Sequence, residues 1–348
     1  MTACAPFVHR SRPSAVRGPV RTAAIRRAQV WRPTNIPALN LAAGPQGHGA
    51  FPPGATITCD YVEKRTEGHS PKFFCAPPSG DELKVKFGRD NGEVYAEVAA
   101  TRLLWALGFG ADAMYSVKVV CRGCPARLGG TPMDGLDRRL FDPAAVERKM
   151  PGKEIVTKDK QGWAWQELDL VDEETSGGAP RAHRDALKLV AALLQHSDSK
   201  PAQQRLACLD DVFVADAPCV HPFMLINDLG QTFGRANTFN RDVIGSANFA
   251  RWSATPVWRD KTGCVANLSG SLTGTLTYPR ISEEGRQFLA GLLVQLSDAQ
   301  IDDLFEAARV FLRPRAPDSK ERVSASVDEW REAFKRKREE IVNRRCEN

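Results

Sequence analysis

The first third of the chain contains several runs in which apolar and polar residues alternate, the period of a half-buried strand. Within this region, apolar residues recur every three to four positions from Asn91 to Leu107, the period of a helix buried along one side. The strand-like runs are residues 55–64, 68–76, 82–88 and 114–121. This order predicts a β-rich region that contains one helix.

The rest of the chain is predicted to be mainly helical, so the whole fold is expected to be α+β. The predicted helices are 142–150 with Pro143 in its first turn, 183–196, 282–296, and two that begin at the capping boxes Ser297–Gln300 and Ser326–Glu329. The predicted strands of this part are 162–171, 205–209 and 219–228.

Composition and charge narrow the class of protein. Apolar residues make up 42% of the 348 residues and charged residues 26%, which is ordinary for a globular protein. No run approaches the roughly 18 consecutive apolar residues of a membrane span. The net charge is +6, but residues 1–57 hold seven arginines and no acid, so the remainder has a net charge of −1. We therefore expect no nucleic-acid-binding role for the body of the protein.

The first 50 residues are expected to form a disordered, Arg-rich leader. Their composition fits a disordered tail, a targeting peptide or a start codon assigned too early. They lack the roughly 7–15-residue apolar segment of a secretory signal. This favours a cytoplasmic location, and export stays open if the true start differs.

Nine cysteines are thinly spread along the chain. Cys121 and Cys124 form one C-x-x-C pair, and a zinc or redox site would normally need a second pair or well-spaced histidines. Cys208 and Cys219 flank an expected hairpin, across which they are able to form a bridge. For each cysteine, a small buried apolar residue is the favoured interpretation.

Two polar features belong to the β-rich region. Lys86 lies inside an apolar strand, where a solvent-facing lysine is an equally good interpretation because strands alternate. The next helix carries Glu93 and Glu97, four residues apart and therefore on one face. Glu97 is expected to be the deeper of the two, and a buried carboxylate needs a cation such as Lys86. Two solvated acids are the alternative.

Two more polar features follow the expected helix 183–196. In the turn HSDSKPAQ, Asp198 is followed two residues later by Lys200 and five residues later by Gln203. Asp228 then ends an apolar strand and precedes Leu-Gly, a position that suits a magnesium ligand. Taken singly, these features are also compatible with a polar helix end before a proline turn and with a common Asp-x-Gly turn.

In this order, the four features resemble the protein-kinase-like superfamily, whose protein members carry H-R-D-x-K-x-x-N and D-F-G. The resemblance spans roughly residues 55–310. It looks like the divergent HipA-like, Fam20-like and phosphoinositide-kinase-like branches, and like a bacterial family with the same HSDSKPAQQRL, NDLG and CRGC strings. It implies a two-lobed fold. The β-rich N-lobe would cover 51–170, with a polar insertion at about 125–160, and a mainly helical C-lobe would cover 171–348.

The resemblance also implies an ATP- and Mg²⁺-dependent phosphotransferase. Its acceptor would carry a hydroxyl group on a protein, sugar, lipid headgroup or metabolite. The implied roles are phosphate binding for Lys86, pairing with Lys86 for Glu97, catalytic base for Asp198 with Lys200 beside it, Mg²⁺ binding for Asp228 and Gln203, and cover over the phosphates for Ser70 and Lys72.

Four departures from the kinase pattern keep a second function open, a pseudokinase-like binding or scaffold protein. Ser197 stands in place of the usual arginine. Gln203 replaces the usual asparagine and is one methylene longer. The chain has no G-x-G-x-x-G, and residues 233–252 take the place of the A-P-E segment. A pure scaffold, however, has no physical need for two carboxylates near a shared metal, which favours the kinase hypothesis.

Overall fold

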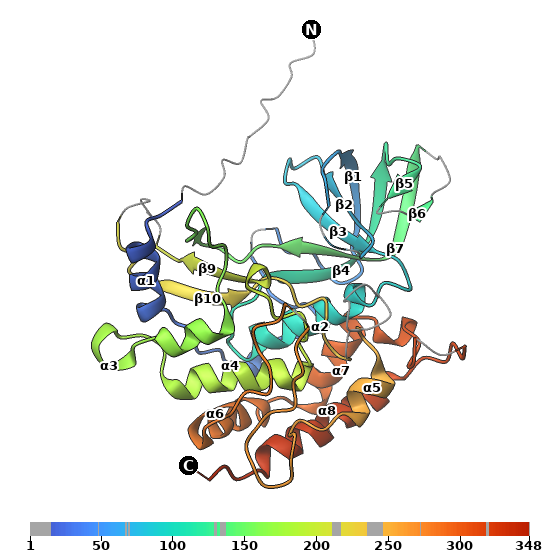
Figure 1. The fold of residues 1–348 in the computed structure, drawn as a ribbon. Helices are drawn as coiled ribbons and strands as arrows, with labels where there is room; N and C mark the ends of the chain where they lie inside the picture. Colours follow the sequence, from blue (N-terminus) through green and yellow to red (C-terminus); the bar gives the residue numbers. More distant parts are fainter. Residues whose placement is uncertain are drawn as a thin grey trace.

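The protein is described here by a computed structural model. It describes residues 15–47, 49–66, 68, 70–128, 131–132, 137–210, 217–234, 246–271, 273–317 and 320–347. Figure 1 shows a β-rich part lying over a mainly helical part. The β-rich part is a closed five-stranded barrel in the order β1-β2-β3-β7-β4. Its strands are β1 (Thr56–Val62), β2 (Lys72–Ala76), β3 (Leu83–Phe87), β4 (Ala113–Arg122) and β7 (Arg138–Arg148).

Helix α2 (Glu93–Ala106) lies between the barrel and the helices below it (Figure 1). It packs against β4 on one side and α7 (Asp298–Ala307) on another. Nearly every residue of α2 is buried, including Val94, Val98 and Leu103. A helix that is buried all round is part of the core, so α2 is a rigid platform for the polar groups that it carries.

The helical part contains α4 (Arg181–Leu194), α6 (Glu283–Leu293), α7 and α8 (Val327–Val342), with the shorter α3 (Glu173–Ser176) and α5 (Phe249–Ala254). A three-stranded antiparallel sheet adjoins it, in the order β10-β9-β8. The strands are β8 (Lys153–Glu154), β9 (Gln204–Cys208) and β10 (Pro222–Ile226), and β5 (Arg127–Leu128) and β6 (Thr131–Pro132) pair separately. Short 3₁₀ turns are Ile36–Ala38, Trp165–Leu170, Pro201–Gln203 and Val310–Leu312.

The α+β prediction is confirmed, and so are both predicted capping boxes, which begin α7 and α8. Two predicted elements are wrong. Residues 142–150 are not a helix, because residues 138–148 form β7, a barrel strand paired with β3 and β4. The expected polar insertion at 125–160 therefore contains part of the barrel. Residues 162–171 are not a strand, and most of them form the 3₁₀ turn Trp165–Leu170.

The prediction of a disordered leader over residues 1–50 is wrong for most of its length, while residues 1–14 lie outside the described part. Residues 18–27 form α1 (Gly18–Arg27), and Ile25, Val30 and Leu41 are buried in the main core. Arg21 is also buried, and its guanidinium lies 2.7 Å from the carboxylate of Glu167. The segment holds no acid of its own, but acids far along the chain supply the missing partners.

The cysteines also differ from expectation, because eight of them form disulfides rather than buried free thiols. The pairs are Cys59–Cys75, Cys121–Cys124, Cys208–Cys219 and Cys264–Cys346. The bridge across the β9–β10 hairpin is the one that the sequence suggested as an alternative. Such dense pairing is typical of proteins that fold in an oxidising compartment. Among the described residues, no helix combines the length and apolarity that crossing a bilayer requires.

Candidate active site

The centre of the candidate site is Lys86 on β3, which is completely buried. Its ammonium nitrogen lies 2.7 Å from Glu97 Oε2, 2.8 Å from Glu93 Oε2 and 3.5 Å from Asp228 Oδ1. Strand β3 supplies the lysine, α2 supplies both glutamates, and the turn after β10 supplies the aspartate. We call these four residues the Lys86 cluster.

Glu93 is the member of the cluster to which the sequence analysis gave no role. Its Oε2 accepts a hydrogen bond from Ser70 Oγ at 2.8 Å, and its Oε1 accepts one from Gln231 Nε2 at 3.0 Å. The signal for Glu93 was present in the sequence, since it lies four residues before Glu97 and shares its helix face. The expected difference in burial did not distinguish the two glutamates, because the turn at Gly230 packs against Glu93 and buries it as well.

The charges of the Lys86 cluster do not cancel, because three carboxylates surround one ammonium group. Burial alone would lower the pKa of Lys86, but Asp228, Glu93 and Glu97 hold it well above its usual value. Burial raises the pKa of Glu97 to about 7, although Lys86 opposes this. Burial would also raise the pKa of Asp228, and Lys86 instead brings it below its ordinary range. The cluster therefore has a net negative charge at neutral pH.

A tight turn after β10 holds Asp228 in place. The backbone N–H of Gly230 donates a hydrogen bond to Asp228 Oδ1 at 3.1 Å. A β-carbon added at Gly230 would lie only 2.8 Å from Glu93 Cδ, which no ordinary side chain tolerates. Glycine is therefore required here by the close approach of Glu93 rather than by the backbone conformation.

The second half of the site is the turn that follows α4. Gln195 takes the left-handed conformation at the helix end, with φ of 56°, and His196 is completely buried. Burial lowers the pKa of His196 to about 4, so its ring is neutral at pH 7. Lys200 Nζ lies 3.2 Å from Asp198 Oδ2, and Gln203 Nε2 donates to the same oxygen at 2.8 Å. Within the described residues, Asp198 Oδ1 is buried without a hydrogen-bond partner.

Backbone hydrogen bonds join this turn to the Lys86 cluster. The N–H of Asn227 donates to the carbonyl of Gln203 at 2.9 Å, one residue before Asp228. The N–H of Ser197 donates to the carbonyl of Gln231 at 3.2 Å. These bonds fix the Asp198 turn against the Asp228 turn, so the two halves of the site form one unit.

The predicted site residues thus fall into two groups. Lys86, Glu97 and Asp228 meet directly, and Ser70 joins them through Glu93. Lys72 lies opposite Lys86 in the β2–β3 pairing, and burial together with Lys86 lowers its pKa.

The second group comprises Asp198, Lys200 and Gln203. The side-chain amide of Gln203 is turned toward Asp198. In the segment 233–252, which takes the place of the A-P-E region, residues 235–245 lie outside the described part.

Several solved structures are similar to the chain. The Helicobacter pylori proinflammatory kinase CtkA matches with a TM-score of 0.41 and 9% identity, covering 84% of this chain and 95% of that one. A Golgi casein kinase with Mn/ADP bound matches with a TM-score of 0.36 and 12% identity, covering 84% of this chain and 73% of that one. The Chaetomium thermophilum Rio2 kinase–ADP/Mg²⁺–phosphoaspartate complex matches with a TM-score of 0.29 and 13% identity, covering 72% of this chain and 70% of that one. No family model and no curated protein matches the chain.

Each of these three structures is named as that of a kinase. At such low identities and TM-scores they assign no residue and no substrate. What the site does must therefore be inferred from its own geometry.

Proposed function

We propose that the protein is an ATP- and Mg²⁺-dependent phosphotransferase, an atypical kinase with a two-lobed fold, which transfers the γ-phosphoryl group to a hydroxyl acceptor. The observation that carries this proposal is the composition of the Lys86 cluster, in which two buried carboxylates and the partly exposed Asp228 share one lysine. Buried charges are normally paired or bound to a metal, so an excess of carboxylates favours a divalent cation.

The residues present fit a magnesium ion. Ligand oxygens of Glu93, Glu97 and Asp228 lie within 4.8 Å of one another, and carboxylate oxygens are the ligands that Mg²⁺ prefers. When bound, Mg²⁺ would neutralise charge on the nucleotide phosphates. Asp228 and Glu93 are the ligands that this geometry favours. Gln203 remains a proposed ligand only if its amide turns away from Asp198.

The remaining roles follow from position and charge. Lys86 would bind the nucleotide phosphates, and Glu97 would hold its ammonium group in place. Asp198 would accept the proton of the attacking hydroxyl, for which its buried and unpartnered Oδ1 is suited. Lys200, beside Asp198, would offset the negative charge that develops on the transferred group.

One observation favours the second candidate, a pseudokinase-like binding protein. Lys200 and the amide of Gln203 both contact Asp198 Oδ2, which leaves this oxygen already paired. With both lone pairs of Oδ2 engaged, this oxygen is not available to a substrate hydroxyl. The scaffold hypothesis would gain if nucleotide binds without turnover.

Calorimetry with ATP in the presence and absence of Mg²⁺ tests the proposal. We expect heat of binding that requires the metal, and we expect Asp228→Ala to abolish it without unfolding the chain. Asp60→Ala is the matched control, because Asp60 is an exposed acid that pairs only with Arg122 in the described structure. If the native protein gives no heat at millimolar ATP, the kinase hypothesis fails.

A further inference from the structure

A second cavity lies away from the Lys86 cluster, at the opposite end of β10. Strand β10 begins at Pro222 beside this cavity and ends at Ile226, two residues before Asp228. Its volume is about 620 Å³, within the range of small-molecule sites. The lining residues are Arg27, Gln29, Arg32, Ser176, Gly177, Leu209, Val220, His221, Pro222 and Phe223. We call it the β10 pocket.

The lining of the β10 pocket carries two positive charges, and its His221 contacts Asp210 through Nδ1 at 2.6 Å. Arg27 and Arg32 contribute two guanidinium groups, and none of the ten lining residues is acidic. Within the described part of the chain, neither arginine forms an ion pair, unlike the neighbouring Arg26, which pairs with Asp172 at 2.5 Å. Both arginines are exposed, so an anion in the pocket would be attracted to them without first breaking an ion pair of theirs.

The other walls of the β10 pocket are largely apolar. Phe223, Leu209 and Val220 line it, and Val220 is 63% exposed. The guanidinium carbon of Arg32 lies 5.3 Å from the centre of the Phe223 ring, which holds the charge beside the apolar surface. An exposed apolar surface next to two cations suits a ligand that has both an apolar body and a negative group.

The pocket is also built on a fixed framework. Gln29 pairs with Phe223 in a parallel bridge, and the N–H of Met224 donates to the Gln29 carbonyl at 2.9 Å. Gln29 Nε2 donates to the carbonyl of Gly177 at 2.9 Å, which joins the segment of Gln29 to the turn at Gly177. The cavity therefore has a preformed shape, as small-molecule sites usually do.

From these features we propose that the β10 pocket binds a small phosphate monoester with an apolar or aromatic body. A phosphate monoester is close to doubly charged at neutral pH and so matches two guanidinium groups, which bind phosphate oxygens in a planar, bidentate manner. The inference does not depend on the kinase proposal, because it uses no residue of the Lys86 cluster or of the Asp198 turn.

Titration of the full-length, disulfide-bonded protein with phenyl phosphate, followed by calorimetry, tests the inference. We expect saturable binding that weakens at least about tenfold in Arg27→Ala/Arg32→Ala, since both charge-assisted contacts are lost. Arg26→Ala is the matched control, because Arg26 is exposed and adjacent but lies outside the lining, and it should change the affinity less than about twofold. Inorganic phosphate and benzoate should bind more weakly than phenyl phosphate, and phenol should not bind.

Other outcomes would overturn the assignment. Equal weakening by Arg26→Ala would show that general surface charge, not the pocket, binds the anion. Binding that disappears in Asp228→Ala would place phenyl phosphate at the Lys86 cluster instead. A glutamate-rich peptide that binds more tightly than phenyl phosphate, through the same two arginines, would replace the small molecule by a protein partner.

Discussion

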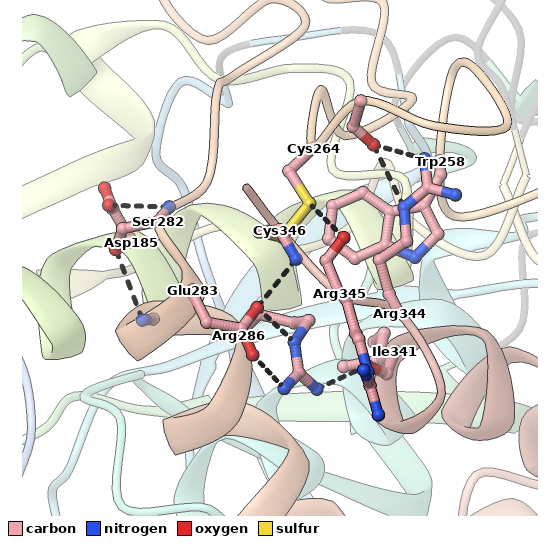
Figure 2. Close-up of a disulfide and its surroundings, with 12 residues drawn as sticks. Asp185, Trp258, Cys264, Ser282, Glu283, Arg286, Ile341, Arg344, Arg345 and Cys346 are labelled. Atoms are coloured by element: carbon pink, nitrogen blue, oxygen red, sulfur yellow. Dashed lines mark hydrogen bonds and ion pairs between the residues drawn. A yellow bond between two sulfur atoms is a disulfide. The ribbon is translucent and has the colours of Figure 1, made fainter. Parts of the chain in front are cut away.

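Two groups of charged residues in this protein are built on opposite principles. Near the C-terminus, the disulfide Cys264–Cys346 lies beside Glu283 and Arg286, a region that we call the C-terminal clamp (Figure 2). Glu283 accepts hydrogen bonds from Arg286 at 2.6 and 2.9 Å and from the N–H of Cys346 at 2.8 Å. Arg286 also donates to the carbonyl of Ile341 at 2.9 Å. One acid thus meets one base, and backbone groups and the side-chain amide of Gln287 take the remaining bonds.

The Lys86 cluster has the same kinds of group but a different balance. Three carboxylates meet one lysine. Lys86 and Glu97 are more deeply buried than the clamp, whereas the side chain of Asp228 is about as exposed as that of Glu283. An ion pair of equal and opposite charges with complete hydrogen bonding is compatible with a purely structural role. A buried group with more carboxylates than cations has an excess negative charge, which another cation must offset. The comparison supports the proposal that the Lys86 cluster is a binding site, whereas the clamp is structural.

The largest expected effect separates chemistry from stability within the proposed active site. Asp198→Asn should keep Mg²⁺-dependent ATP binding but lower turnover by about 10³-fold or more, because the amide cannot accept the acceptor's proton. Phosphoryl transfer from labelled ATP to pooled acceptor classes would measure it. Equal turnover in this variant would remove Asp198 from the role of base, and Asp185→Asn, outside the site, serves as the control for a buried aspartate.

The next effect tests the clamp through its covalent bond. Replacing Cys264 and Cys346 by serine should lower the free energy of unfolding by about 4 to 5 kcal/mol, since the bridge spans 82 residues. The same change at Cys121 and Cys124, three residues apart, should cost only about 2 kcal/mol because the closed loop is short. Chemical denaturation under non-oxidising conditions would compare the two variants. Similar losses in both would show that loop closure is not what the clamp disulfide contributes.

Much of the fold and part of the candidate site were predictable from the sequence, because their signals are local. Strands β1 to β4 and helix α2 follow from alternation and helical spacing, and the capping boxes at Ser297 and Ser326 mark their helices. The order of Lys86, Glu97, Asp198 and Asp228 also suggested one site. The strands and helices were accessible because each depends on residues that lie close together in the chain, whereas the site was suggested by the family-like order of four separate motifs.

The features that were missed depend on distant partners. Residues 142–150 have a helix-like local pattern, and only pairing with β3 and β4 on both sides makes the segment a strand. Arg21 has its acid, Glu167, 146 residues away. The disulfide Cys264–Cys346 likewise needs the packing of α8 before its two halves meet. No local pattern contains that information.

The pH dependence of stability separates the Asp198 turn from the clamp. Burial lowers the pKa of His196 from 6.5 to about 4. Its contribution to the free energy of unfolding is therefore complete above pH 6.5 and is lost as pH falls through 4. The loss should approach about 3 kcal/mol. The pKa of Glu283 is lowered to about 2 by Arg286, so the clamp loses stability only below about pH 4.5.

Subtracting the pH profile of a His196→Leu variant from that of the native protein isolates the first of these effects. The subtraction is needed because Glu97 acts in the opposite direction. Its pKa is raised from 4.5 to about 7 by burial, so its contribution is present below pH 4.5 and is lost as pH rises through 7. A difference profile that is flat between pH 6.5 and 4 would contradict a neutral, buried His196.

The smallest expected effect is the most direct test of the comparison, because one substitution is made in both regions. Glu283→Gln should lower the free energy of unfolding by about 1 to 3 kcal/mol, since the new amide faces only donors from Arg286, Gln287 and the Cys346 backbone. Glu93→Gln removes one of three competing carboxylates.

The surroundings of Glu93 also tolerate an amide better than those of Glu283. Gln231 is able to turn its side chain so that its buried Oε1, which lacks a partner in the described structure, accepts from the new group. In metal-free buffer, Glu93→Gln should therefore change stability by less than about 1 kcal/mol, or raise it, while Mg²⁺-dependent ATP binding weakens. If it instead destabilises the protein as much as Glu283→Gln, Glu93 is a structural ion-pair partner, and charge imbalance no longer distinguishes the binding site from the clamp.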